Sequence, residues 1–371
     1  MYEGCYWMHA EDLSHFMIDV FQGLRVPAED AAICADILIT ADKYGIDSHG
    51  IGRLKPIYYD RINAGIQEPV TQFEILREGP TTAVVDGHNG MGHVIGKQSM
   101  DMAIKKAKDL GLGMVTVRNS THYGIAGYYA LMGIEAGVIG ITGTNARPSI
   151  APTFGVENML GTNPLTIGMP TDEAFPFVLD CATSVSQRGK IEVYDRDGKE
   201  VPPGWVIDRS GQTRTDTHQI LKDLVSGTAA LTPLGGIGEE MGGYKGYGYA
   251  TVVEVLSAAL QGGSFLKALS GLDSSGQHQP YHLGHFFLAI NIEAFTQLDA
   301  FKKTAGDIMR SLRTSEKAPG HDRIYTAWEK EYLTWQQRKN QGIPLNLALQ
   351  KQMIQMRNEL GLHQYHFPFE S

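Results

Sequence analysis

Ala83-Val84-Val85-Asp86 opens the stretch of sequence that decides the fold, and Val138-Ile139-Gly140-Ile141-Thr142 closes it. Between them stand Met114-Val115-Thr116-Val117 and two helical patterns, Val94 to Leu110 and Ala126 to Ala136. Short runs rich in β-branched residues are typical of strands. Their alternation with helices predicts a mixed α/β layer.

Further elements of this layer lie later in the chain. Phe177-Val178-Leu179-Asp180 and His285 to Ile292 have the same strand-like composition. Gly243 to Ala259 has a helical pattern, and we expect that helix to pack on the sheet. The region from 73 to 299 is therefore predicted to form one mixed α/β domain.

The two ends of the chain have a different, helical pattern. Glu11 to Leu24 carries apolar residues with a period of 3.6, at Leu13, Phe16, Met17, Val20 and Phe21. Further helices are predicted over 27–41, 52–65, 293–312 and 347–360. We expect residues 1–72 and 300–371 to pack together as a helical domain, with the α/β domain inserted between them.

The composition limits the classes of function. The chain has 371 residues, 42% of them hydrophobic, which suits a large globular enzyme. No run approaches the ~20 apolar residues of a membrane span, and no signal peptide is recognisable. The net charge of −9 argues against a nucleic-acid surface. Three cysteines, Cys5, Cys34 and Cys181, fit neither a disulfide framework nor a zinc motif, so a reducing cytoplasm is the expected location.

The usual dinucleotide-binding fingerprint is missing. Gly111-Leu112-Gly113 precedes a predicted strand instead of following one, and Gly236-Ile237-Gly238 has no strand directly before it. A phosphate-binding P-loop is also absent. Motif rules alone therefore do not predict a Rossmann enzyme.

Six segments nevertheless resemble a known family, the type 2 malate/L-lactate dehydrogenases, which are unrelated to the Rossmann lactate dehydrogenases. They occur in the family's order over roughly residues 10 to 330. The segments are Asp47-Ser48-His49-Gly50 with Arg53, Asn119-Ser120-Thr121-His122-Tyr123-Gly124, Gly161-Thr162-Asn163-Pro164, Asp180-Cys181-Ala182-Thr183-Ser184 with Gly189-Lys190, Gly204-Trp205-Val206-Ile207-Asp208 and Gly243-Tyr244-Lys245-Gly246-Tyr247-Gly248.

The resemblance implies an NAD- or NADP-dependent oxidoreductase that interconverts a small 2-hydroxy acid and its 2-keto acid. It also implies a non-Rossmann cofactor fold and a homodimer whose site draws on both chains. The residues of these motifs are most similar to those of the malate branch, which favours malate and oxaloacetate as the substrate pair. Lactate, sulfolactate or a cyclic-imine acid is the alternative substrate within the family.

Two histidines and an arginine suit this chemistry. Moving a hydride at an alcohol carbon requires a proton transfer at its oxygen, and histidine has a pKa near working pH. His49 and His122 are both candidates, one to transfer the proton and the other to orient the carbonyl. Arg53, about one turn past His49, is a bidentate clamp for the substrate carboxylate. The family often has a tyrosine four residues after this arginine, where this chain has Ile57. Ser48, Tyr58 and Arg147 are further candidates for binding substrate.

The cofactor is expected on loops rich in small residues, where main-chain amides approach a pyrophosphate closely. Lys245, among three glycines, is a natural phosphate cation. Where the family often has Pro-Gly-Glu near the adenosine, this chain has Ala327-Trp328-Glu329. The candidate cofactor residues are Ser120, Gly161, Thr162, Asn163, Asp180, Ala182, Thr183, Ser184 and Lys245.

Two other classes of function are alternatives to a dehydrogenase. A metal-dependent hydrolase or lyase is suggested by the spacing of His282 with His285 and of His88 with His93, although thirteen histidines make such pairs common by chance. A strand would also turn the rings of His282 and His285 to opposite faces. A non-catalytic cofactor-binding protein is the other alternative, and the histidines with Arg53 argue against it. We predict no metal site.

Overall fold

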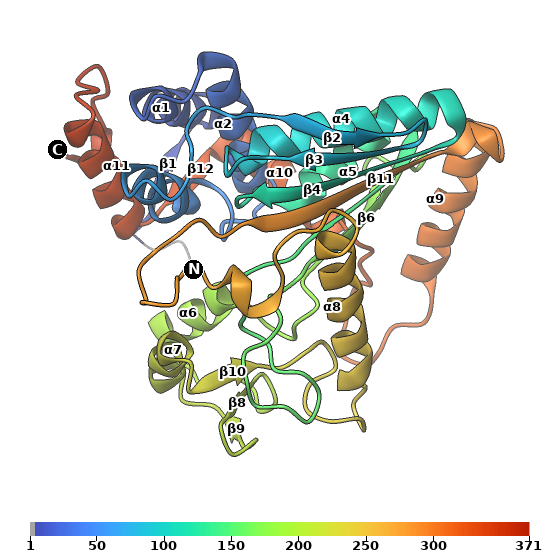
Figure 1. Cartoon of the computed structure of the whole chain (residues 1–371). Coiled ribbons are helices and arrows are strands. Elements are labelled where there is room, and N and C mark those ends of the chain that lie inside the picture. The colour runs from blue at the N-terminus through green and yellow to red at the C-terminus, as the bar shows by residue number, and fades with distance from the viewer. Residues whose placement is uncertain (1–3, 371) are drawn as a thin grey trace.

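A seven-stranded mixed sheet forms the centre of the computed structural model, which describes residues 4–370 (Figure 1). The strand order is β2-β3-β4-β11-β5-β6-β7, and only β3 and β4 run parallel. One parallel pair in an otherwise antiparallel sheet differs from the parallel doubly wound fold. The predicted non-Rossmann, mixed α/β class is therefore confirmed. The strands are β2 (Glu74–Glu78), β3 (Thr82–Asp86), β4 (Leu112–Ser120), β5 (Val138–Thr144), β6 (Leu165–Met169), β7 (Phe177–Cys181) and β11 (Leu283–Asn291).

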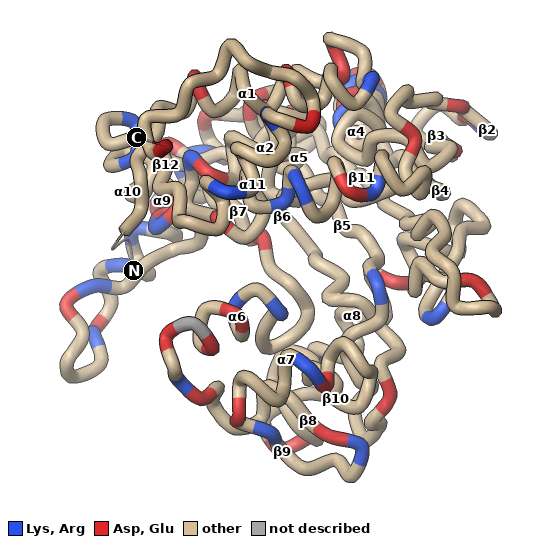
Figure 2. Tube along the Cα trace, turned by 90° about the vertical axis from the view of Figure 1, so that its left-hand side faces the viewer, with Lys and Arg blue, Asp and Glu red and all other residues tan. Residues whose placement is uncertain are grey.

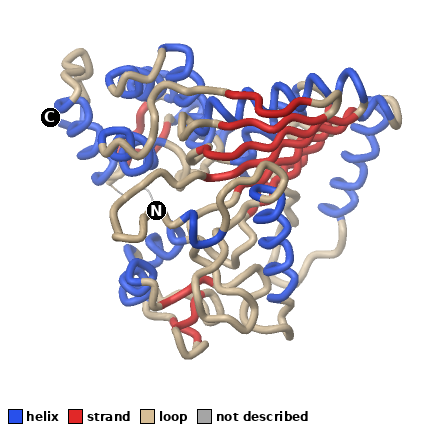
Figure 3. The backbone as a smooth tube through the Cα atoms, in the orientation of Figure 1, coloured by secondary structure: helices blue, strands red, loops and turns tan. Residues whose placement is uncertain are grey.

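Two helices cover one face of this sheet and a third packs against it through one end (Figure 3). α4 (Gly92–Leu110) and α5 (Ala126–Glu135) lie on the strands that the sequence predicted around them. α5 approaches β5 closely, since a Cβ added at Gly140 would lie 3.0 Å from the Ala130 carbonyl oxygen. α8 (Gly243–Ala258) meets the sheet near its C-terminal end, where the backbone of Ser257 touches Gly284 of β11.

Segments from both ends of the chain share one hydrophobic core. All five apolar positions predicted for the first helix are buried in α1 (Ala10–Gly23), where they pack with residues of the C-terminal helix α11 (Leu347–Glu359). A short antiparallel pair, β1 (Tyr6–Met8) with β12 (Ile343–Leu345), joins the two ends. The remaining elements of this unit are α2 (Ala28–Lys43), a 3₁₀ turn (Ile51–Arg53), a π-helix (Leu54–Tyr59), α3 (Asp60–Asn63) and α10 (Glu329–Gln341).

A separate lobe, which the sequence did not reveal, lies on the other side of the sheet from α4 and α5 (Figure 2). Its small sheet has the order β10-β8-β9, and its own core contains Ile150, Ile191 and Ile220. The described residues form three larger hydrophobic cores, one in the helical unit, one between the sheet and α4, and one in the lobe. The division of the chain into 1–72 with 300–371 and 73–299 stays a prediction. The lobe consists of β8 (Val206–Asp208), β9 (Thr213–Arg214), β10 (Ala229–Leu231), α6 (Arg188–Arg196) and α7 (Thr217–Ser226).

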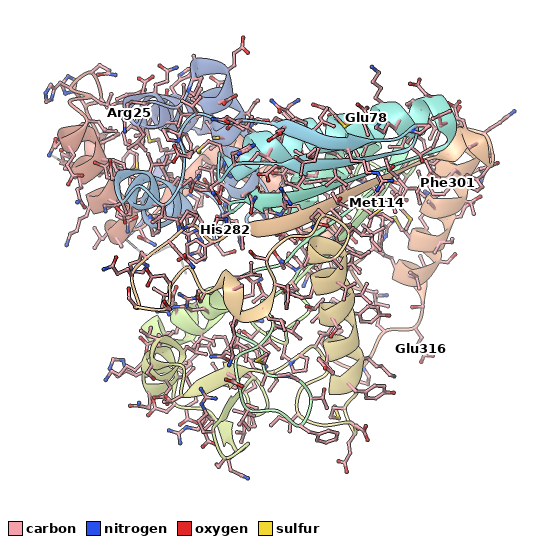
Figure 4. All side chains as sticks on the ribbon, in the orientation of Figure 1. Arg25, Glu78, Met114, His282, Phe301 and Glu316 are labelled. Carbon is pink, nitrogen blue, oxygen red and sulfur yellow. The ribbon has the colours of Figure 1, made fainter. Side chains whose placement is uncertain are left out.

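One predicted helix lies outside the shared core of the chain ends. α9 (Leu298–Thr314) runs along the far side of the molecule, where Arg310 pairs with Asp172 in the loop after β6. Phe301, labelled in Figure 4, marks this helix. Within residues 4–370, no helix is both long enough and apolar enough to span a bilayer.

Candidate active site

The carboxyl end of β4 brings His122 to the boundary between the sheet and the helical unit. β4 ends at Ser120, and His122 follows in the turn before α5. The start of α4 fixes this turn, because the amide of Gly92 donates to Thr121 Oγ1 at 3.0 Å and that hydroxyl donates to the Gly90 carbonyl at 2.7 Å. A Cβ at position 92 would lie 2.4 Å from the Thr121 carbonyl oxygen, so the close approach requires glycine.

A tyrosine and a second histidine hold one side of the His122 ring. The Tyr58 hydroxyl lies 2.6 Å from His122 Nδ1 and 2.8 Å from Nε2 of His93, the second residue of α4. Tyr58 and His93 are both fully buried. From the sequence alone, His93 is suggested only as half of a metal-binding pair with His88. The glycine directly before His93, Gly92, was the available signal, because it permits the contact with the His122 turn.

The ring of His49 stacks beside that of His122. The two imidazole rings are nearly parallel, with centroids 5.7 Å apart and an interplanar angle of 18°. Ser48 Oγ lies 2.8 Å from His49 Nδ1, so it fixes the ring of its neighbour, and its side chain is exposed. The structure thus brings together the two histidines predicted to share the proton transfer, and it gives each a hydrogen-bond partner at Nδ1.

Two buried residues, Arg338 and Asp42, support the loop that carries His49. Arg338 of α10 forms a two-pronged ion pair with Asp47, with N–O distances of 2.5 and 2.8 Å. The loop also crosses the end of α2 closely, where a Cβ at Gly50 would lie 1.8 Å from Asp42 Oδ1. Asp42 accepts the amide of Ile51 at 2.8 Å. Glycine at position 50 is therefore a geometric requirement.

A π-helix explains the displaced tyrosine. A π-helix holds one residue more per turn than an α-helix and occurs often at functional sites. Here it spans Leu54–Tyr59, directly after Arg53. Within this helix Tyr58, five positions after the arginine, reaches His122, whereas the family's tyrosine was expected four positions after it, at Ile57.

The pocket lowers the proton affinity of both histidines. Burial, followed by the charge of Arg53, lowers the pKa of His49 to about 4. Burial also lowers the pKa of His122 well below its usual range, and the charges of His49, His93, Arg61 and Arg53 add to the effect. Both rings are therefore neutral at pH 7 while the pocket holds no anion.

Arg53 acts electrostatically on both histidines, and Arg61 acts on His122. Arg53 Nε donates to the Ser48 carbonyl oxygen, which leaves the outer nitrogens of its guanidinium for other partners. The start of α6 in the lobe lies beside it, since a Cβ at Gly189 would be 3.6 Å from Arg53 Nη2. Arg147 is exposed, and it interacts electrostatically with Arg61, a residue that the sequence analysis missed.

Several predicted cofactor residues use their side chains to hold the loops together. Asn163 is buried and donates to Glu254 Oε2 at 2.7 Å. Thr183 donates to the Asn163 carbonyl at 3.0 Å, and the amide of Thr183 donates to the Thr162 carbonyl at 2.9 Å. Ser184 donates to the Ser186 carbonyl at 2.7 Å. Gly161 passes the Ala146 carbonyl so closely that a Cβ would lie 2.4 Å from its oxygen.

Asp180 and Ser120 lie at strand ends near the start of α5. Asp180, at the end of β7, accepts the amide of Gly127 at 2.7 Å and the hydroxyl of Thr166 at 2.8 Å. Ala182 follows two residues later, half-buried. Ser120 is buried, and its hydroxyl has no hydrogen-bond partner among residues 4–370. A nicotinamide nucleotide offers an amide and ribose hydroxyls, and the unpartnered Ser120 hydroxyl suits a hydrogen bond to such a group.

Lys245 and Trp328 do not lie at the strand ends that carry Ser120 and Asp180. Lys245 is exposed in the first turn of α8, far along that helix from the end that meets the sheet. Its neighbour Gly246 packs on Leu234, whose amide donates to the Thr183 carbonyl at 2.8 Å. Trp328 has a φ of 73°, a left-handed conformation that glycine adopts easily. Its ring is buried and packs 3.2 Å from the position that a Cβ on Gly127 would take.

Two of the histidines behind the metal hypothesis have other partners, whereas Nδ1 of His282 has none among the described residues. His88 Nε2 lies 2.7 Å from Glu74, and His285 Nδ1 lies 2.7 Å from Thr144 Oγ1 in the core. In the described part of the chain, no three His, Cys, Asp or Glu side chains gather as a metal site would require.

Comparison with known proteins agrees with this geometry. The family model described as malate/L-lactate dehydrogenase matches residues 8–354. A malate dehydrogenase of Pyrococcus horikoshii is 44% identical over 94% of this chain and 94% of its own length. An L-sulfolactate dehydrogenase of Methanocaldococcus jannaschii is 38% identical over 95% of this chain and 97% of its own length.

The fold matches solved structures of the same group. The crystal structure of malate dehydrogenase from Entamoeba histolytica superimposes with a TM-score of 0.94 at 46% identity, and it covers 98% of this chain and 99% of the other. The match extends over the sheet, the lobe and the helical unit, so every part of the candidate site lies within it. The chain is a nicotinamide-dependent 2-hydroxyacid dehydrogenase, and it belongs to the malate/L-lactate dehydrogenase family.

Proposed function

We propose that this dehydrogenase interconverts malate and oxaloacetate and that His122 transfers the proton. The observation that carries the proposal is the Tyr58 hydroxyl bound to His122 Nδ1 at 2.6 Å, beside arginines that no carboxylate neutralises in the described residues. A group that transfers protons needs a fixed ring, and an anionic substrate needs cations. Relatives named as malate dehydrogenases support the substrate.

Substrate orientation would fall to Arg53. Its outer nitrogens can bind the C1 carboxylate as a bidentate pair, which also fixes the direction of the keto oxygen. His49, whose ring is nearly parallel to that of His122, would orient the carbonyl from the other side. The nicotinamide cofactor, when bound, supplies or accepts the hydride at C2 of the substrate.

His122 would exchange the proton at the substrate oxygen through Nε2, because Tyr58 occupies Nδ1. A tyrosine hydroxyl can donate or accept. It can therefore donate to His122 Nδ1 when Nε2 carries the proton, and accept from Nδ1 when Nε2 is free. We assign Tyr58 a positioning role instead of the predicted substrate contact, because its side chain is fully buried.

We propose NAD in preference to NADP. Asp180 is the carboxylate among the candidate cofactor residues, and the charge that acts on it most is that of another acid, Glu331. A carboxylate selects the ribose 2′-hydroxyl and repels a 2′-phosphate. The ratio of kcat/KM with NADH and NADPH tests this assignment, and equal values would contradict it.

We further propose that the chain forms a homodimer through α8. This helix is apolar on both sides, which is typical of a helix buried all round. Ala250 and Val253 face the core, whereas Val252 and Val255 are 49% and 51% exposed. Val255 and Phe265 line an apolar cavity of about 680 Å³. Light scattering should give a dimer mass, and Val252→Glu should yield monomers. A monomeric wild-type chain would contradict the proposal.

Absorbance of the reduced nicotinamide tests the proposed reaction. Purified protein would receive NADH or NADPH together with oxaloacetate, pyruvate or a cyclic imine acid. Rapid oxidation with oxaloacetate is the expected result. Faster turnover of pyruvate or of the imine would move the chain to another branch of the family, and silence with every pair would overturn the proposed reaction.

A further inference from the structure

Arg61 is a half-buried cation for which the fold provides no carboxylate. It lies in α3, one residue after Asp60, but that acid pairs with Lys55 at 2.7 Å. Within residues 4–370, no hydrogen bond or ion pair to the Arg61 guanidinium is found. Its contact is with an aromatic ring, because the guanidinium carbon lies 4.2 Å from the centre of Tyr281.

The loop before β11 supplies this ring. Tyr281 is followed by His282, which Figure 4 labels where the chain enters the sheet below the helical unit. Gly271 packs against the same ring, since a Cβ there would lie 2.5 Å from it. A guanidinium stacked on a tyrosine keeps its edge, with all its N–H groups, free for a partner in the plane.

Arg61 acts on the proposed reaction centre. Burial lowers the pKa of Arg61, the nearby Tyr281 and Tyr58 oppose that change, and the charges of Arg147 and Arg53 lower it further. The charge of Arg61 in turn contributes to the lowered pKa of His122. Arg53 and Arg147 thus both act on Arg61, and none of the three has an ion-paired acid among residues 4–370. Such a cluster is unfavourable until an anion enters.

One carboxylate accounts for only one of these arginines. Arg53 lies beside His49 and is the clamp proposed for the C1 carboxylate. Arg61 lies eight residues after Arg53 in the sequence, with Tyr58 between them. A second anionic group on the substrate would neutralise its charge. Other arginines of the protein already have acids: Arg338 holds Asp47, and Arg310 holds Asp172.

We propose that Arg61, stacked on Tyr281, binds a second anionic group on C3 of the substrate and makes the enzyme selective for dianionic 2-oxo and 2-hydroxy acids. The group can be a carboxylate, as in oxaloacetate, or a sulfonate, as in sulfopyruvate. This assignment rests on the proposed 2-hydroxyacid site, and it names the residue that separates such substrates from pyruvate.

The test compares Arg61→Gln with Arg77→Gln, which removes the same charge from the exposed strand β2. With oxaloacetate and with sulfopyruvate, Arg61→Gln should lose about 100-fold in kcat/KM, mainly through KM, as expected for one buried charge-assisted contact. With pyruvate it should change less than about 3-fold. Arg77→Gln should match the wild type with every substrate. An equal loss with dianions and pyruvate, or no loss with either dianion, would overturn the assignment. A loss with only one dianion identifies the group that Arg61 binds.

A binding measurement separates this assignment from the proposed reaction. With NADH present, L-malate and L-lactate cannot be turned over, so their effect on the melting temperature reports binding alone. L-malate should raise the melting temperature of the wild type and of Arg77→Gln, but not of Arg61→Gln or Tyr281→Leu. This pattern without oxaloacetate turnover would support Arg61 and refute the proposed reaction. A full L-malate shift in Arg61→Gln would refute the role of Arg61. Circular dichroism of each variant would verify its fold.

Discussion

Tyr58→Phe tests the histidine arrangement most directly, because it removes a single oxygen from the middle of the chain of hydrogen bonds. That oxygen lies 2.6 Å from His122 Nδ1 and 2.8 Å from His93 Nε2, and the ring around it is fully buried. Phenylalanine fills the same volume, so the packing should survive. What changes is that the two imidazoles lose their shared partner.

The size of the effect follows from the hydrogen bonds lost, since His122 Nδ1 would keep only the longer bond from the Gly124 amide, at 3.3 Å. A buried polar group that loses its hydrogen bond costs about 1–3 kcal/mol. For His122, a loss of about 2 kcal/mol in the transition state corresponds to roughly a 30-fold fall in kcat. His93 Nδ1 already lacks a partner, so the substitution leaves His93 with none in the described residues and should also lower the free energy of unfolding by about 1–3 kcal/mol.

The assay is steady-state oxidation of NADH with oxaloacetate, with Tyr59→Phe as the matched control. Tyr59 is the next residue, but its hydroxyl donates to Glu359 on α11 instead of to the histidines. Tyr58→Phe should lower kcat with little change in KM, since Arg53 is untouched, and should shift the pH profile. Tyr59→Phe should leave kcat unchanged. Equal kcat values for the two variants would refute the positioning role of Tyr58.

Three further predictions follow from the same geometry. His122→Ala should lower kcat by about 100-fold or more, because it removes the group that transfers the proton. His49→Ala should lower kcat by a similar factor if orienting the carbonyl matters as much as transferring the proton. Near-normal turnover in either variant removes that histidine from the mechanism. Arg53→Lys should raise KM for the keto acid, because lysine lacks the two-pronged geometry, and an unchanged KM would move the C1 clamp elsewhere. Burial raises the pKa of Asp42 from 3.8 to about 8, so the folded chain binds this proton more tightly than the unfolded chain. That contribution to stability is complete below about pH 4 and is lost as the pH rises toward 8. The melting temperature of Asp42→Asn should therefore depend less on pH between 5 and 8 than that of the wild type. An unchanged slope of melting temperature against pH would contradict this prediction.

Local sequence patterns predicted the elements whose stability is decided locally. The five apolar positions of α1 all reached the core, and the strands around α4 and α5 lie where their composition placed them. The strands of the lobe and α10 were missed for a physical reason. β8 and β9 are only three and two residues long, and α10 buries little apolar surface, so these elements have no periodic pattern to detect. In contrast, α7 does have such a pattern, because Ile220, Leu221 and Leu224 pack in the core of the lobe. The predicted cytoplasmic location stays a prediction.

The residues of the candidate site also differ in whether a local pattern predicted them. His49, His122 and Arg53 were found because they belong to motifs that resemble a family. His93 and Arg61 belong to none, and their roles come from partners distant in sequence: Tyr58 for His93, and Tyr281 for Arg61. The π-helix was not predicted either, because its residues, Leu54–Tyr59, show no local pattern that distinguishes it from an α-helix.

The charge of the pocket shows why composition alone misleads about ligands. The whole chain carries −9, which by itself would repel a dianion. However, the acids nearest the site in sequence are committed to other cations, Asp47 to Arg338 and Asp60 to Lys55, so they cannot neutralise Arg53 or Arg61. At physiological salt, exposed charges are screened over about 8 Å, whereas half-buried ones are screened much less. The local positive field therefore decides what enters the pocket. For the same reason, the loss of a surface arginine such as Arg77 should not affect substrate selection.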